Sequence, residues 1–167
     1  YEITVGMGVR RVAFTVVQTM VEYFNQNEKR DAVLGGVIPK NMIFCNWGVT
    51  KKVMAWTSDA MLRPMFFTKE LHIKNGTAMQ PSLLYVLKDK HLDIYATDAK
   101  GKLYSAPYHN VNTKGDVCLG NAKTTKPKDK TYLSLIDYYE KLFWGSEFSH
   151  LAGHGSPIKG NINSYWN

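Results

Sequence analysis

One cysteine in this 167-residue sequence has neighbours that suit nucleophilic chemistry. Cys118 lies in the segment 103–122, which contains Pro, Gly and Asn and shows no sustained hydrophobic period. An irregular stretch of this length inside a compact domain is usually functional. Val117 and Leu119 flank the cysteine, so we expect them to anchor the loop while the thiol stays accessible. Such a thiol can attack an activated carbonyl carbon and form a thioester.

Asn110, eight positions before Cys118, is the second candidate. Its amide N–H₂ group is a donor that can meet an oxygen developing negative charge near the thiol. An Asn in a turn also bonds the loop backbone, so a structural role stays open beside the catalytic one. Gly115 permits a turn that a residue with a Cβ would resist, and we expect it to shape the loop.

Two histidines are candidates for supporting roles. His150 follows the last predicted helix and can fold back toward Cys118, where it would deprotonate an incoming nucleophile or cap a turn. We expect His109, next to Asn110, to shape the loop. Cys45 lies in a predicted strand, and we interpret it as a buried, inert thiol.

The elements that must position these residues indicate an α+β fold. After a short strand over residues 1–8, apolar residues from Val9 recur at the spacing of one helical face and predict a helix over about 9–29. An antiparallel meander of four or so strands is predicted from segments rich in β-branched and aromatic residues, which are 41–46, 50–57, 64–68, 82–88 and 91–97.

The last elements surround the irregular loop. Thr131 is placed to cap a helix over about 132–143 that ends at Gly145. Residues 153–167 are rich in Gly, Asn and Ser, so we expect a flexible tail. The order of helix, meander, long loop and helix predicts a single α+β domain over residues 1–167, with the sheet backed by helices.

Composition and charge narrow the function classes. The net charge is +7, but the basic residues are mostly scattered and the aromatic residues follow core periodicity, so we do not expect nucleic-acid binding. No apolar run reaches the length of a membrane span. The two cysteines fit neither a zinc-ligand spacing nor a disulfide scaffold. We therefore expect a cytoplasmic protein without a cofactor or a metal.

The spacing in the loop resembles that of ubiquitin-conjugating enzymes. Those enzymes carry His-Pro-Asn followed by Gly-x-Val/Ile-Cys-Leu, with eight positions from the Asn to the Cys. Here Asn110 and Cys118 have the same separation, and residues 115–119 match the second element position for position. The first element reads Tyr-His-Asn, so His109 stands where the family has Pro.

Longer segments resemble the conjugating-enzyme-like protein B family of the bacterial PRTRC plasmid systems. The matching segments are IPKNMIFCNW, VMAWTSDAMLRPMFF, QPSLLYVL, LYSAPYHNV, GDVCLGN and LFWGSEFSH. The resemblance implies a ubiquitin-conjugating-enzyme (UBC)-like fold and a transferase in which Cys118 carries a ubiquitin-like protein as a thioester before transfer to an acceptor amine. It also implies three partners: the ubiquitin-like protein, a ThiF-type activating enzyme that supplies it, and a JAB-type peptidase.

Other functions stay open. A catalytically silent adaptor of the same fold would only bind the ubiquitin-like protein, although the retained Cys and its spacing from Asn110 argue against this. A Cys/His hydrolase would use Cys118 with His109 or His150 and would leave no stable thioester to a partner. A DNA-binding role is suggested only by the net charge.

Overall fold

The structure, a computed structural model, describes residues 2–5, 8–11, 34–48, 50–120, 122–153 and 155–167. The chain divides into two compact units, Tyr1–Val33 and Leu34–Asn167. In the first unit, β1 (Glu2–Val5) and β2 (Gly8–Arg11) pair antiparallel.

This pairing corrects the predicted start of the first helix, because residues 9–11 belong to β2. Val9 fits the apolar period of a helix and the pattern of a short strand equally well, so periodicity alone could not locate the boundary. The remainder of that predicted helix, residues 12–29, lies outside the described residues.

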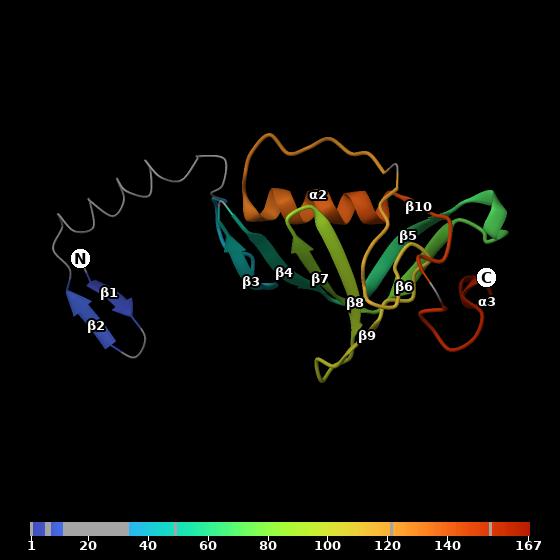
Figure 1. Cartoon of the computed structure of the whole chain (residues 1–167), viewed down its shortest axis with the longest axis horizontal. Helices are drawn as coiled ribbons and strands as arrows, with labels where there is room; N and C mark the ends of the chain where they lie inside the picture. The colour runs from blue at the N-terminus through green and yellow to red at the C-terminus, as the bar shows by residue number, and fades with distance from the viewer. Residues whose placement is uncertain (1, 6–7, 12–33, 49, 121, 154) are drawn as a thin grey trace. The chain divides into compact units, whose positions relative to one another are not determined.

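The second unit is built on a five-stranded antiparallel sheet with the order β3-β4-β7-β8-β9 (Figure 1). Its strands are β3 (Met42–Trp47), β4 (Lys52–Ser58), β7 (Ser82–Lys88), β8 (His91–Thr97) and β9 (Leu103–Ser105). Four of the five predicted strand segments are therefore confirmed as strands of this sheet. The short β9, which was not predicted, pairs with the last three residues of β8.

The fifth predicted strand belongs to a second sheet. There β5 (Met61–Phe67) pairs antiparallel with β6 (Gly76–Gln80) and parallel with β10 (Glu147–Phe148), and the 3₁₀ turn η2 (Lys69–Leu71) follows β5. The register runs from Ser58 opposite Leu83 to Met61 opposite Gln80, so β4–β5 and β6–β7 form one long ribbon. The predicted meander is therefore interrupted, because β4 continues into β5 without a hairpin between them.

Helix α2 (Tyr132–Trp144) packs on the sheet, as Figure 1 shows, and confirms the predicted helix and its cap. Thr131 and Ser134 form a capping box, in which each side chain accepts from the other residue's backbone N–H at 3.1 Å. Glu140 accepts hydrogen bonds from the Trp56 indole at 3.1 Å and from Arg63 at 2.7 Å, which fixes the helix on the ribbon. The buried residues of α2 are Ile136, Tyr139, Leu142, Phe143 and Trp144.

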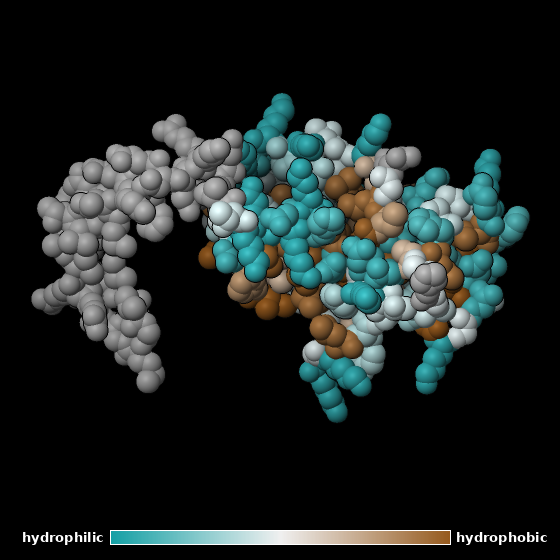
Figure 2. All heavy atoms as spheres, in the orientation of Figure 1, coloured by the Kyte–Doolittle hydropathy of each residue, from teal (hydrophilic) through white to brown (hydrophobic). Residues whose placement is uncertain are grey.

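The opposite face of the sheet is less completely covered by the described residues. Phe44 pairs with Ala55, which lies between the fully buried Met54 and Trp56, so Phe44 points away from α2. Ile43 and Phe44 are both more than half exposed. Figure 2 shows hydrophobic surface over the end of the sheet formed by β3 and β4.

The chain ends in a short helix, α3 (Ile162–Trp166). Within the segment expected to be a flexible tail, Ile162 is buried and Trp166 stacks on Tyr108 with ring centroids 6.0 Å apart. Composition predicted a loose segment because most of its residues are Gly, Asn and Ser, whereas two large apolar side chains are enough to dock it. No helix in the described part of the chain is long and apolar enough to cross a membrane.

Candidate active site

The loop that carries Cys118 is attached to the edge of β8. Ile94 N–H donates to the Gly115 carbonyl at 2.7 Å, and Val117 N–H donates to the Leu92 carbonyl at 3.0 Å. Residues 115–117 therefore extend the sheet where β9 does not reach. Cys118 follows this paired stretch directly and is exposed, so the sheet positions a thiol that solvent and a partner can reach.

A tight turn over residues 112–116 brings the loop back to β8. Asn112 Oδ1 accepts from the backbone N–H of Lys114 at 2.8 Å and from that of Asp116 at 3.1 Å. Gly115 has a φ of +94°, and a Cβ at this position would lie 2.5 Å from a carbon of the Tyr95 ring. Tyr95 also donates to the Lys114 carbonyl at 2.6 Å. Backbone conformation and the neighbouring ring thus both require glycine here.

Asn110 holds Cys118 through the backbone and is itself fixed through its side chain. Cys118 N–H donates to the Asn110 carbonyl at 2.8 Å. Asn110 Nδ2 donates to the Glu147 carbonyl at 2.9 Å, and Oδ1 accepts from Ser149 N–H at 3.0 Å. A carbonyl only accepts and a backbone N–H only donates, so these partners determine the orientation of the amide. Its second N–H hydrogen has no hydrogen-bond partner among the described residues.

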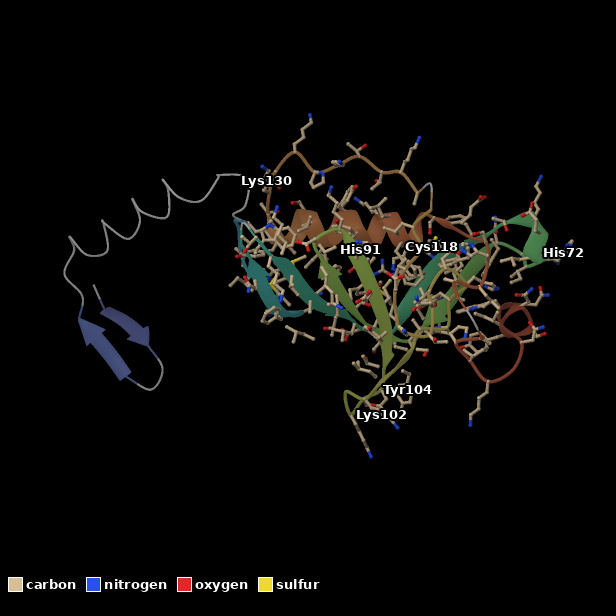
Figure 3. All side chains as sticks on the ribbon, in the orientation of Figure 1. His72, His91, Lys102, Tyr104, Cys118 and Lys130 are labelled. Carbon is tan, nitrogen blue, oxygen red and sulfur yellow. The ribbon has the colours of Figure 1, made fainter. Side chains whose placement is uncertain are left out.

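Asn110, Cys118 and His150, the three predicted catalytic residues, line one cavity of about 410 Å³. Gly145, just beyond the last residue of α2, is also part of the lining. Figure 3 shows Cys118 on its loop near that end of α2. The other polar residues of the lining are Thr68, Lys123, Ser146, Glu147 and Ser149.

His150 is connected to Asn110 through Ser149. His150 Nδ1 lies 2.8 Å from Ser149 Oγ, and Ser149 Oγ lies 3.4 Å from Asn110 Oδ1. Since a hydroxyl has one hydrogen, donation to Asn110 leaves Ser149 Oγ to accept from a protonated Nδ1. In that arrangement the exposed imidazole has Nε2 as its acceptor, whereas a Ser149 hydroxyl that donates to Nδ1 would leave the hydrogen on Nε2. Ser149 was not predicted as a site residue. The only indication in the sequence was its position next to His150.

The sequence model of prokaryotic E2 family D matches residues 16–167. This range includes every residue of the cavity. The chain belongs to prokaryotic E2 family D. An α+β structure with antiparallel sheets is compatible with an E2-like fold. No curated protein and no solved structure matches the chain significantly.

His109 of this E2 family D protein points away from the cavity lining and into the protein. Its side chain is buried, and Nε2 lies 2.7 Å from Asn163 Oδ1, so this nitrogen carries the hydrogen. Nδ1 is buried without a partner among the described residues. Burial lowers the pKa of His109, and the hydrogen bond to Asn163 opposes this shift. The neutral imidazole therefore lies behind the turn and does not line the cavity with Cys118.

Cys45, His72 and His91 of this family member do not line the cavity. Cys45 is half-buried where we expected full burial, and desolvation raises the pKa of its thiol. His72 follows the η2 turn, and Figure 3 shows it far from Cys118. His91 begins β8 next to Leu92, whose carbonyl accepts from Val117 N–H, so His91 lies near Cys118 but does not line the cavity. Across the described ranges, no group of three or more His, Cys, Asp or Glu residues is placed to hold a metal ion.

Proposed function

We propose that this protein is a conjugating transferase that carries a ubiquitin-like protein as a thioester on Cys118. The observation that carries the proposal is that the exposed Cys118 and Asn110 line one cavity, with their backbones joined by a hydrogen bond. Membership of a prokaryotic E2 family supports a conjugating role for this cavity.

In the charging step, the Cys118 thiolate attacks the activated C-terminal carbonyl carbon of the ubiquitin-like protein. A carbon–sulfur bond forms, a tetrahedral oxyanion develops, and the bond to the leaving group on the activating enzyme breaks. The leaving group takes up the proton that the thiol has lost. An exposed thiol on an open cavity suits this reaction, because the tail of a large protein must reach the sulfur.

In the transfer step, an acceptor amine attacks the thioester carbonyl. The carbon–nitrogen bond forms, the carbon–sulfur bond breaks, and the sulfur leaves as a thiolate. Asn110 supplies its second amide N–H to the oxyanion of this step. Because the other N–H and the oxygen of this amide are fixed by Glu147 and Ser149, little reorganisation is needed when the negative charge develops.

In this proposal His150 accepts the proton that the amine loses. Its ring lies on the wall of the same cavity, and its Nδ1 is oriented by Ser149. A neutral imidazole with one nitrogen hydrogen-bonded and the other open is a suitable general base.

The segments that resemble PRTRC protein B support a bacterial plasmid system as the setting of the protein. In this proposal a ThiF-type enzyme activates the ubiquitin-like protein, and a JAB-type peptidase belongs to the same system. All of these reactions take place in the cytoplasm. Neither a cofactor nor a metal ion takes part in the steps written above.

The test combines the protein with its ubiquitin-like partner, the activating enzyme and ATP. We expect an adduct that is sensitive to reductant in the wild type and absent in Cys118→Ala. Binding of the ubiquitin-like protein without any adduct would contradict the proposal and favour a silent adaptor. Release of a free C-terminal carboxylate without an adduct would favour a Cys/His hydrolase.

A further inference from the structure

Hydrogen bonds join the turn that leads into Asn110 to the segment that follows α2. The Pro107 carbonyl accepts from the Trp166 indole N–H at 2.7 Å, and the His109 carbonyl accepts from Ala152 N–H at 2.9 Å. The His109 imidazole bonds Asn163 at 2.7 Å. With the bonds of Asn110 to Glu147 and Ser149, residues 107–110 and 147–166 are joined in antiparallel order.

The Tyr108 ring is stacked with two other aromatic rings. Phe148 is stacked on it with centroids 5.8 Å apart and an interplanar angle of 22°, and Trp166 is stacked on it at 6.0 Å and 15°. Its hydroxyl donates to Gln80 Oε1 at 2.9 Å. Tyr108 is fully buried, and Trp166 from α3 supplies one of its two stacking partners.

The residue after Tyr108, His109, also contacts α3. Its Nε2–H is buried and donates to Asn163, while Nδ1 already lacks a partner among the described residues. Loss of the Asn163 oxygen would leave both imidazole nitrogens buried and unbonded, which is costly in a protein interior. The side chain of Asn163 therefore satisfies a polar group that lies directly beside Asn110 in the chain.

We infer that α3 positions the Cys118 site, with Asn163 acting through His109 and Trp166 acting through Tyr108 and Pro107 to hold Asn110. Asn110 in turn holds the backbone N–H of Cys118. Asn163 and Trp166 are thus positioning residues that do not line the cavity. Only the catalytic consequence of this inference rests on the proposed function, whereas the positioning is a property of the protein alone.

Hydrogen exchange at the Cys118 amide tests the inference in the full chain without any partner. We expect Asn163→Ala and Trp166→Ala to lower the protection of this amide by about tenfold or more, because the bond to Asn110 opens locally. Amides of β7 and β8 serve as the internal reference and are expected to keep their protection. Ser164→Ala, an exposed position on the same helix, is the matched control and should leave the Cys118 amide unchanged.

A conservative variant separates positioning from general damage. Asn163→Asp keeps an oxygen acceptor for His109, so we expect it to retain the protection that Asn163→Ala loses. Unchanged protection of the Cys118 amide in both alanine variants would overturn the inference. Loss of protection spread equally over β7, β8 and Cys118 would also overturn it, since α3 would then only stabilise the whole fold.

The rate of thioester transfer is measured separately, with the ubiquitin-like protein already on Cys118. We expect Asn163→Ala to slow the transfer by about tenfold and Asn163→Asp to restore it, since a displaced Asn110 stabilises the oxyanion less well. Failure of the wild type to form a thioester would refute the proposed function and leave the exchange result intact. Normal transfer in Asn163→Ala despite an opened Cys118 amide would overturn the catalytic part of the inference.

Discussion

The backbone N–H of Cys118 donates a 2.8 Å hydrogen bond to the carbonyl oxygen of Asn110. The Asn110 side-chain amide forms hydrogen bonds with the Glu147 carbonyl and with Ser149 N–H. A nucleophile and an amide eight positions apart are thereby fixed as one unit on the cavity wall. The predictions below address the parts of this unit in turn.

Replacement of Asn110 by Ala should affect both rate and stability. Loss of an oxyanion donor typically costs about 10²–10³ in rate, so transfer from Cys118 to a small amine should slow by this factor. Loss of the bonds to Glu147 and Ser149 should lower the free energy of unfolding by about 1–3 kcal/mol. Single-turnover transfer and urea unfolding measure the two effects. A stability loss with normal transfer would assign Asn110 a structural role only.

Replacement of Gly115 by Ala should distort the loop through two separable effects. The positive φ and the overlap with the Tyr95 ring together should cost about 2–4 kcal/mol of unfolding free energy. Gly101→Ala is the matched control, because Gly101 also has a positive φ but has no atom within 4 Å of the added Cβ. We expect Gly115→Ala to be the more destabilising, and the excess to shrink in a Tyr95→Ala background. Equal losses at the two glycines would contradict the role given to the Tyr95 ring.

His109 should make stability depend on pH in a known direction. Its pKa is lowered in the folded protein, whereas it lies near about 6.5 in the unfolded chain. As the pH falls below about 6.5, the unfolded chain binds a proton that the folded protein excludes, so the free energy of unfolding decreases. The slope from this one group is at most about 1.4 kcal/mol per pH unit. Above about 6.5 the group contributes no pH dependence.

Urea unfolding of the wild type and of His109→Gln between pH 7.5 and 5.5 isolates this contribution. Glutamine can donate to Asn163 but does not titrate, so the variant should lose less stability on acidification than the wild type. Other titrating groups contribute to both proteins and cancel in the comparison. The same acid dependence in both proteins would show that His109 is not held neutral by burial.

Replacement of His150 should separate the two steps of the reaction. As the proposed general base, His150 assists the amine and not the charging of Cys118, so His150→Ala should slow transfer by about 10²-fold and leave thioester formation nearly unchanged. Ser149→Ala removes the hydroxyl that orients the ring and should give a smaller loss in the same step. Equal losses in charging and transfer would point to a disturbed cavity and not to proton transfer.

The sequence was most informative where one local rule decides the structure. Thr131 and Gly145 marked the ends of α2 because caps act within one helical turn. The separation of Asn110 from Cys118 matches that of ubiquitin-conjugating enzymes, and this resemblance predicted that both residues belong to one site; both line the same cavity. The strands β3, β4, β7 and β8 were visible from their β-branched and aromatic residues.

Contacts between distant segments were not predictable in the same way. The bond from Asn110 to the Glu147 carbonyl could not be predicted from the sequence, because every residue type has a backbone carbonyl. The pairing of β5 with β6 and β10 depends on how the long ribbon bends. The docking of α3 depends on the stacking of Trp166 on the Tyr108 ring, a contact that the composition of the segment does not predict.

The most direct test of the central claim is the intact mass of the protein after reaction with its ubiquitin-like partner, the activating enzyme and ATP. We predict one added ubiquitin-like protein, less one water, bound through a bond that hydroxylamine cleaves. The adduct should persist in Cys45→Ala, disappear in Cys118→Ala and become stable to reductant in Cys118→Ser. No mass increase under conditions that charge the activating enzyme, or an adduct that survives in Cys118→Ala, would contradict the account.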